Sequence, residues 1–468
     1  MTQSGLRPAA GFHNNSAFMT KPLNRLRREL SAGQMAMVAV GGSIGTGLLL
    51  GSGAAIQIAG PSVILSYIVG GLIAFAVTMA LGEMSSLHPA AGSFGVYADT
   101  YLNPWAGFVS RYGYWFAVVI SISAELVASA TYARFWLPQV PALAWIAIYA
   151  AMLLFINLRT VGDFGSFEYW LAMIKVVVIT AFITIGAALL VGGKVDAHYT
   201  AHGGFLPHGA VGPLLALSFV LFNYLGTEMV AISSGEARSA GEIPRATYIS
   251  FALLTFVYLF ASTVLVGVVP WNRVGTSESP FVTVFEVARV PAISHIMNFV
   301  ALTAALSGSN ASLYVTSRML YSLAESGFAP AKLTKLTSTG SPRWAVLVSA
   351  SGIFVALLVQ YAAPQNAYLY IIGASLFGGL LAWCIALASH IAMRKRLSSQ
   401  EVAALPMRAP GGAVASLIAL AAITSIVIST WWVPQSRITI VSAGPYLLFL
   451  TVFYVLMKKN KAANRMTP

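Results

Sequence analysis

Four glycines lie within seven residues near the start of the chain, in the segment Gly41-Gly42-Ser43-Ile44-Gly45-Thr46-Gly47. The flanking residues are apolar enough for a membrane helix, but each glycine costs about 0.8–1 kcal/mol relative to alanine inside a helix. The segment is therefore predicted to unwind, and unwound backbone survives in hydrocarbon only where it lines a cavity or binds a ligand. A second half-helix would begin here, and its free N–H groups and positive dipole end would suit a carboxylate.

The same glycines are also compatible with a purely structural role. Gly41 and Gly45 have the small-xxx-small spacing of a helix face that packs closely against another helix. A nucleotide-binding loop is excluded, because no strand precedes Gly45 and no lysine of the Walker type follows Gly47. Ligand binding and close helix packing thus stand as the two interpretations of this segment.

A second, weaker break is predicted at Phe222-Asn223-Tyr224-Leu225-Gly226-Thr227-Glu228, which places polar groups and a carboxylate inside another apolar segment. Transporters built from inverted repeats have broken helices at corresponding positions of their two halves. The two breaks fall in the first and sixth apolar segments, which are the first members of two consecutive sets of five. This pairing predicts a five-plus-five inverted repeat.

Lys175 is the ionisable residue deepest in an apolar segment, about nine residues or 13 Å from its start. An ammonium near the bilayer centre costs at least about 2.5–3.5 kcal/mol, so such a residue is a functional candidate by default. Desolvation disfavours the charged form whereas carbonyl contacts favour it, so a change of conformation could couple protons to transport. The alternatives are a permanently protonated structural residue and a lysine that reaches water at the interface.

Four further charged residues have candidate roles. Glu228 could relay protons or accept hydrogen bonds from the unwound backbone, and Glu125 could contact a substrate or pair with Arg134 at the rim. Glu83 and Arg318 are interpreted as gating or packing charges on the cytoplasmic side. These roles remain alternatives at the level of sequence.

The elements that position these residues are predicted from composition. The chain has 468 residues, 57% of them hydrophobic and 9% charged, whereas soluble domains are about one quarter charged, so the solvent must be a bilayer. The apolar runs are continuous, unlike the alternating strands of a barrel, so the fold class is all-α integral membrane. Twelve spans are expected, at 34–57, 62–86, 105–131, 142–158, 167–192, 211–233, 246–269, 292–325, 344–361, 367–392, 412–432 and 438–457.

Orientation follows from the basic residues, which remain on the cytoplasmic side during insertion. With a cytoplasmic N-terminus, 21 of the 27 Lys and Arg residues lie in inside segments and five lie outside. Both termini are therefore expected in the cytoplasm. The expected divisions are a tail at 1–30, a transporter domain at 31–457 and a tail at 458–468, with repeats at 31–192 and 210–393 and two extra helices within 412–457.

Several partners and cofactors are excluded. The net charge of +13 lies in short loops beside the membrane without a nucleic-acid-binding module, so anionic lipid explains it better than nucleic acid. One cysteine, Cys384, cannot form an internal disulfide, and the irregular spacing of His198, His202 and His208 argues against a metal site. The sequence predicts no metal and no cofactor.

Four segments carry a resemblance to a known family: GGSIGTGLLLGSG at 41–53, GEMSSLHPAAGSFGVY at 82–97, LGTEMVAISSGEARSAGEIPRA at 225–246 and SRMLYSLAESGFAP at 317–330. With them the chain resembles members of the amino acid, polyamine and organocation superfamily, most of all its bacterial amino acid and GABA permeases. The resemblance implies a LeuT-type fold, alternating access, an amino acid substrate and the bacterial inner membrane.

The resemblance also implies a set of site residues. The loop of the first span would bind the substrate carboxylate, the backbone of the sixth span would bind the amino group, and Phe222 would be the aromatic gate. Lys175 would occupy the position of a sodium ion and bridge carbonyls near Gly42 to the eighth span near Ser307 and Ser309. The expected substrate-binding residues are Gly42, Ser43, Ile44, Gly45, Thr46, Gly47, Phe222, Asn223, Leu225 and Gly226, with Ser121, Glu125 and Ser307 as possible side-chain pocket.

The predicted function is secondary active import of an amino acid or a GABA-like amino acid, coupled to protons through Lys175 and Glu228. A membrane-embedded amino acid sensor and an uncoupled exchanger are the alternatives. An enzyme is not expected, because no Ser/His/Asp set and no metal-ligand spacing accompanies the apolar segments. A channel would need a continuous polar pore, whereas these polar breaks are isolated.

Overall fold

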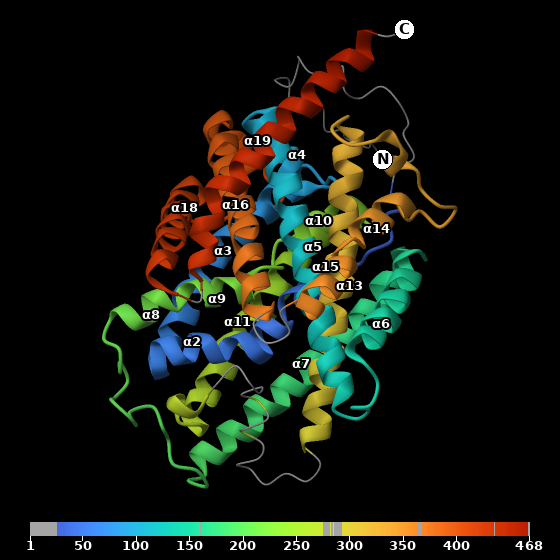
Figure 1. Cartoon of the computed structure of the whole chain (residues 1–468). Helices are drawn as coiled ribbons and strands as arrows, with labels where there is room; N and C mark the ends of the chain where they lie inside the picture. Colours follow the sequence, from blue (N-terminus) through green and yellow to red (C-terminus); the bar gives the residue numbers. More distant parts are fainter. Residues whose placement is uncertain are drawn as a thin grey trace, which may run out of the picture.

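The computed structural model describes residues 26–466 apart from 160, 275–280, 282–283, 285–292, 363–366 and 435. Regular structure in this part of the chain is helical, and its β contact is an isolated parallel bridge between Leu30 and Ala237. Long helices stand side by side, and a long loop at residues 192–210 connects two of them (Figure 1). The fold is therefore all-α, as the continuous apolar runs predict.

The two predicted repeats divide the helices into two halves, with the C-terminal helices last, and this division stays a prediction. The first half contains α1 (Ala32–Ser43), α2 (Ser52–Ala59), α3 (Val63–Leu87), α4 (Ser93–Tyr101), α5 (Pro104–Arg134), α6 (Ala142–Asn157) and α7 (Val161–Val191). The second half contains α8 (Val211–Leu215), α9 (Leu217–Tyr224), α10 (Met229–Ser233), α11 (Glu242–Val268), α13 (Ile293–Glu325), α14 (Arg343–Ser349), α15 (Gly352–Ala362) and α16 (Ala367–Arg396). After these come α17 (Ser399–Ala403), α18 (Gly412–Ser429) and α19 (Arg437–Met466).

Each of the twelve predicted spans overlaps helical residues of the structure. Among the described residues, eight helical stretches are both long and apolar enough to cross a membrane, and two shorter apolar helices lie at 142–157 and 343–355. The chain is therefore a multi-pass membrane protein, and the total of twelve crossings stays a prediction.

The helix starts follow local sequence signals. Ser31 and Gln34 form a capping box at α1, in which the Ser31 hydroxyl accepts from the Gln34 N–H and the Gln34 side chain accepts from the Ser31 N–H. Asn103 caps α5 by accepting from the Ala106 N–H, with Pro104 as the first helical residue. These caps set where the two helices begin, and so which of their residues reach membrane depth.

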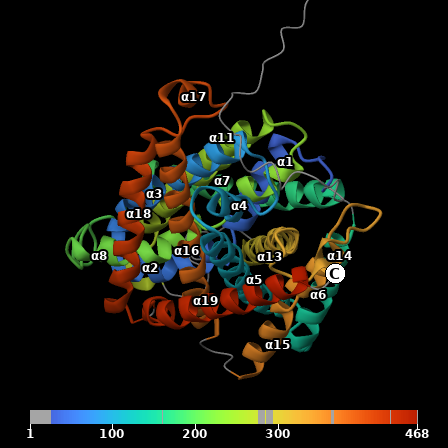
Figure 2. The same ribbon diagram turned by 90° about the horizontal axis from the view of Figure 1, so that it is seen from above.

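Helix α5 is the central element of the bundle. It packs most extensively against α13 and α16, and it also contacts α4, α6, α15 and α19. Helix α1 lies among α7, α11 and α13. Seen from above, α18 and α19 lie at the periphery of this bundle (Figure 2).

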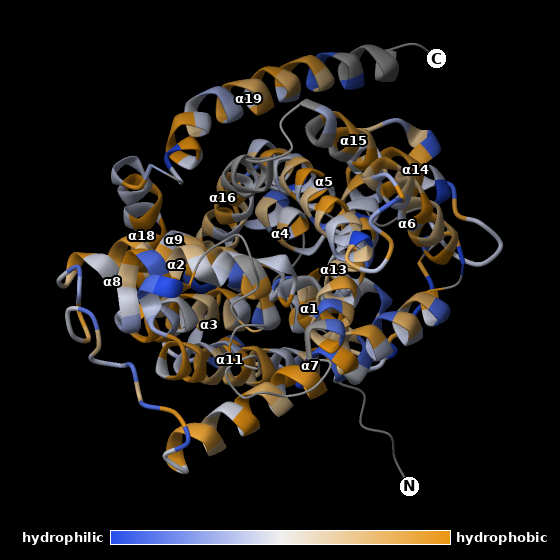
Figure 3. Cartoon of the chain, turned by 60° about the horizontal axis from the view of Figure 1, so that its bottom comes forward, coloured by the Kyte–Doolittle hydropathy of each residue, from blue (hydrophilic) through white to orange (hydrophobic). Residues whose placement is uncertain are grey.

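The periphery is strongly apolar. Leu417 and Ile418 of α18 and Leu448 and Phe449 of α19 are each more than half exposed, and hydrophobic residues dominate the outer helices (Figure 3). A water-soluble monomer rarely exposes so much contiguous apolar surface. Hydrocarbon is the solvent that these helices fit.

Glu83 and Arg318, predicted as gating or packing charges, each lie in a buried ionic cluster. Glu83 at the end of α3 accepts hydrogen bonds from His390 and Arg394 of α16 and from the Ala409 N–H, at 2.5–3.1 Å. Arg318 of α13 pairs with Glu236 at 3.0 Å. Buried charges persist in this way only where partners compensate the loss of water.

Candidate functional site

The first predicted break is an interruption between α1 and the helical residues that follow it. Helix α1 ends at Ser43, and Ile44 leaves the helical conformation with φ −84° and ψ 79°. A short π-helical turn at Gly47–Gly51 then leads into α2. The interruption lies inside the glycine-dense segment, where helix propensity is lowest.

The second predicted break separates α9 from α10. Helix α9 ends at Tyr224, residues 225–228 form a turn, and helical structure resumes at Met229. Gly226 has a φ of +113°, a conformation that is nearly confined to glycine. One glycine therefore provides the conformation on which this interruption depends.

The two breaks are in contact with each other. A Cβ atom on Gly226 would lie 2.5 Å from the Ser43 hydroxyl and 2.7 Å from the Ser43 nitrogen. A Cβ atom on Gly47 would lie 2.7 Å from the Asn223 side-chain oxygen and 3.2 Å from the Phe222 ring. Glycine is thus needed on both sides for the backbones to approach so closely.

A pocket opens where the breaks meet. Ten predicted site residues line it, namely Gly42, Ser43, Gly45, Gly47, Ser121, Glu125, Phe222, Leu225, Gly226 and Glu228. Seven others that the sequence did not single out complete the lining, namely Tyr114, Ala117, Val118, Met229, Ser312, Ser375 and Gly379. The lining therefore comes from both broken helices and from α5, α13 and α16.

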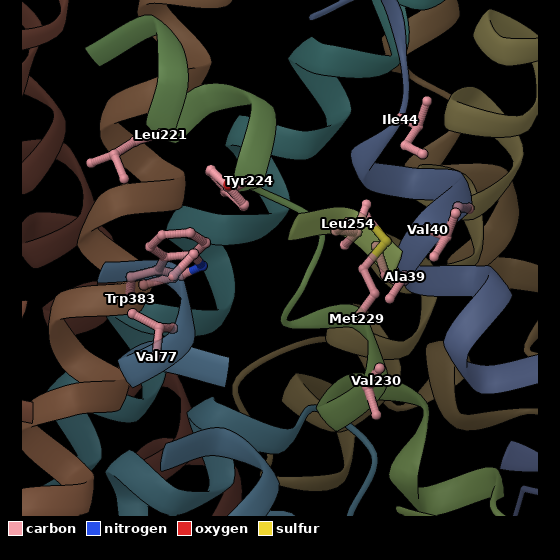
Figure 4. Packing of buried hydrophobic residues seen from close by; sticks show 14 of the residues in the cluster. Ala39, Val40, Ile44, Val77, Leu221, Tyr224, Met229, Val230, Leu254 and Trp383 are labelled. Atoms are coloured by element: carbon pink, nitrogen blue, oxygen red, sulfur yellow. The ribbon is translucent and has the colours of Figure 1, made fainter. Parts of the chain in front are cut away.

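Around the breaks the bundle is densely filled with apolar side chains. Figure 4 shows Val40 of α1, Ile44 directly after it, Met229 beyond the second break, and Trp383 of α16, all of which belong to one buried cluster. Close packing of this kind keeps the interrupted backbones in register with the helices that surround them.

Lys175 of α7 holds the first break. Its side chain is fully buried, and Nζ donates to the carbonyl oxygens of Gly41 and Ile44, each at 2.8 Å. Both carbonyls lie at the end of α1, where the interruption removes partners from the helix hydrogen bonds. The ammonium therefore satisfies backbone groups that would otherwise be unpaired in hydrocarbon.

The predicted bridge from Lys175 to the eighth span is indirect. The hydroxyl of Ser307 donates to Glu168 of α7 in a very short hydrogen bond, and the hydroxyl of Ser309 is buried without a partner in the described structure. Ser307 therefore belongs to a carboxylate site beside Lys175, not to the pocket lining. The prediction placed the eighth-span end of this bridge near Ser307 and Ser309, and the structure joins Ser307 to α7 through Glu168.

Glu125 occupies the position predicted for a substrate carboxylate. Its Oε1 atom accepts hydrogen bonds from the Thr46 N–H at 3.3 Å and from the Thr46 hydroxyl at 3.2 Å. Its Oε2 atom is buried and has no hydrogen-bond partner among the described residues. The amide of Thr46 is thus taken by a side chain of the protein itself.

The alternative of a rim pair between Glu125 and Arg134 is wrong. The ion pairs of the described residues do not include this one, and Glu125 is buried at the break whereas Arg134 is exposed in the last turn of α5. Nine residues separate the two positions, which is about 13 Å along a helix. Glu125 therefore faces the pocket.

Glu228 stabilises the second break. Its carboxylate accepts hydrogen bonds from the Gly226 N–H at 2.9 Å, the Tyr114 hydroxyl at 2.7 Å and the Trp383 indole at 3.0 Å. These contacts match the predicted alternative in which Glu228 binds unwound backbone. The same contacts join the turn to α5 and α16.

Asn223 and Ile44 do not line the pocket. The Asn223 side chain donates to the Tyr67 hydroxyl at 2.7 Å, and the backbone carbonyl oxygen of Asn223 accepts from the Tyr258 hydroxyl at 2.6 Å. Both are buried contacts that fix α9 against α3 and α11. Ile44 contributes the carbonyl that Lys175 binds.

The structure places Glu168 beside the break, a residue that the sequence did not single out. The fifth span was expected to begin at residue 167, which leaves Glu168 at a membrane boundary where a carboxylate needs no explanation. Helix α7 begins at Val161, so Glu168 lies about two turns inside it and is fully buried. A predicted helix start before residue 167 would have placed Glu168 inside the helix and marked it as a candidate site residue.

A helical bundle in which two interrupted helices meet at a pocket is the arrangement of LeuT-type membrane transporters. The fold is similar to that of a manganese transporter of Eremococcus coleocola, solved in complex with an aromatic bis-isothiourea substituted compound. The similarity covers 95% of this chain and 99% of that transporter, with a TM-score of 0.57 and 11% sequence identity. A mutant of that transporter gives a TM-score of 0.58. The fold is of the LeuT type.

The chain belongs to the amino acid permease family, which its residues 34–463 match. It is 36% identical over 457 residues to the uncharacterized amino acid permease YtnA of Bacillus subtilis, covering 95% of this chain and 98% of the relative. It is 34% identical to the gamma-aminobutyric acid permease of the same organism, covering 96% and 97%. Identity to the aromatic amino acid transport protein AroP of Escherichia coli is 35%, covering 94% and 97%.

Proposed function

We propose that this permease imports a neutral amino acid or a GABA-like amino acid across the bacterial inner membrane by alternating access, driven by protons. The distribution of Lys and Arg supports an orientation with both termini in the cytoplasm. The relatives named for gamma-aminobutyric acid and for aromatic amino acids support this substrate range.

One observation carries the proposal. The interrupted helices meet at a pocket, and a buried ammonium binds the carbonyls at the end of α1. Movement of α1 away from α7 would strip Lys175 of both carbonyl contacts and leave its charge in a poorly solvated place. A proton would then leave more readily, which links the position of α1 to protonation.

The substrate would bind with its carboxylate at Ser43, Gly45 and Gly47 and its amino group at the backbone of the second break. Phe222 would close over it, as the contact between Phe222 and Gly47 favours. The remaining lining is largely apolar near Val118 and polar near Ser121 and Ser375. A small or aromatic side chain suits such a mixture better than a second cationic group.

Uptake by purified protein in liposomes tests the proposal. An inside-alkaline pH gradient should drive accumulation of at least one radiolabelled compound among GABA and the common amino acids. Counterflow without a gradient distinguishes a carrier from a channel. Binding without accumulation would favour a sensor, and accumulation that ignores the gradient would favour an uncoupled exchanger.

Glu125→Gln should bind substrate several-fold more tightly than the parent at neutral pH. The Glu125 carboxylate now accepts the hydrogen bond of the Thr46 amide, and a substrate carboxylate bound beside it would be repelled by this like charge. Glutamine keeps the acceptor and removes the charge. Titration of radiolabelled substrate binding at pH 7.5 measures the effect, and weaker binding would mean instead that Glu125 pairs with the substrate ammonium.

A further inference from the structure

Glu168 and Lys175 both contact Gly41 of α1. Both are on α7, seven residues apart and so about 10 Å along the helix axis. Lys175 donates to the Gly41 carbonyl, and the Glu168 carboxylate packs directly against the Gly41 backbone, with the carboxyl carbon 2.9 Å from where a Cβ atom would be. One residue of α1 is therefore in contact with both an ammonium and a carboxylate of the neighbouring helix α7.

The Glu168 carboxylate is anchored to α13, a helix that packs against both α1 and α7. Asn310 of α13 donates to Oε2 at 2.7 Å, and Ser307 of α13 donates to Oε1. Asn310 is held in turn by the Asn157 side chain of α6 at 2.8 Å. Donors on both oxygens are what an ionised carboxylate needs in a buried site.

The charges around this site are few. Lys175 interacts electrostatically with Glu168 and with Glu125 of α5, and Tyr132 of α5 interacts with Glu125. The side chains that α13 places against Glu168, Ser307 and Asn310, are uncharged. Asn157 of α6, which is also uncharged, contacts Asn310. Of the two carboxylates, Glu168 is the one with donors on both oxygens, whereas Glu125 has an unpartnered Oε2.

We propose that Glu168 is the counter-ion of Lys175 beside Gly41 and thereby a positioning residue for coupling, one that sets how readily Lys175 exchanges its proton when α1 moves. This inference rests on the proposed proton-coupled transport. When α1 leaves, Lys175 loses two carbonyls, whereas Glu168 keeps its bonds to α13. The Glu168 carboxylate therefore stays in place when α1 moves, and its negative charge continues to favour the protonated form of Lys175.

Glu168→Gln tests the inference because glutamine preserves shape and can exchange hydrogen bonds with Ser307 and Asn310. Loss of the negative charge disfavours the ammonium, so the pH of half-maximal uptake should move toward acid by about one unit. Uptake of a pool of radiolabelled GABA and the common amino acids is measured in liposomes from pH 5 to pH 8.5. Glu168→Asp, which keeps the charge, should restore the parent profile in large part.

Controls separate this role from a structural one. Glu401→Gln removes a charge from an exposed capping residue of α17 and should leave the profile unchanged, since glutamine serves equally well in a capping box. Gly41→Ala pushes the carboxylate away from α1 and should give a smaller acid shift. Gly33→Ala, whose Cβ would meet only Tyr169 at 3.7 Å, is its matched control.

The outcomes are distinguishable. A parent that accumulates none of the pooled compounds overturns the proposed function. A parent with proton-driven uptake, together with a Glu168→Gln variant of unchanged pH profile, overturns the role of Glu168 alone. If Glu168→Gln does not fold, an unshifted profile in Gly41→Ala overturns the role of Glu168 in the same way.

Discussion

Replacing Lys175 with alanine is expected to abolish proton-driven accumulation, lowering it more than tenfold. The ammonium satisfies the Gly41 and Ile44 carbonyls in a fully buried place. Each buried acceptor left unpaired costs about 1–3 kcal/mol, so the docked position of α1 should also be destabilised. Initial rates of uptake with and without an inside-alkaline gradient measure the loss.

Two comparisons decide what Lys175 does. Lys175→Met approximates the volume of the side chain without its charge, and it should retain counterflow better than Lys175→Ala because it leaves a smaller cavity. Lys194→Ala removes an exposed lysine beyond α7 and should behave as the parent. Gradient-dependent uptake that survives in Lys175→Met would show that the lysine is a structural support and that the proton travels elsewhere.

Both breaks could be predicted from sequence because their cause is local. Four glycines between residues 41 and 47 lower helix propensity whatever surrounds them. The positive φ of Gly226 likewise depends on one residue type. The resemblance to a permease family then assigned roles to the same segments, and ten of the predicted residues do line the pocket.

The partners of the charged residues could not be predicted in the same way, because they depend on which helices become neighbours. Glu125 and Thr46 are 79 residues apart, and no periodicity links them. Glu168 was missed because its helix starts before the apolar run does. Ser375 and Gly379 of α16 have the four-residue spacing of small residues that indicates close contact with another helix. The local sequence does not indicate which helix they contact.

The largest structural effect is expected for Gly226→Ala, which should reduce uptake more than tenfold and lower the melting temperature by about 3 °C or more. A residue with a Cβ atom at φ +113° is strained by about 1–3 kcal/mol. The new methyl group would also meet Ser43 at 2.5 and 2.7 Å, so the two breaks could not remain in contact.

Gly204→Ala isolates the cause of that loss. Gly204 also has a positive φ, of +85°, but a Cβ atom there would meet nothing within 4 Å. The control variant therefore carries the backbone strain without the collision, and it should transport as the parent does. Because the proposed substrate site is formed by both breaks together, loss of uptake should appear only where their contact is blocked. Equal uptake by Gly226→Ala and Gly204→Ala would mean that the breaks work independently, and the substrate would then have to be held by one of them alone.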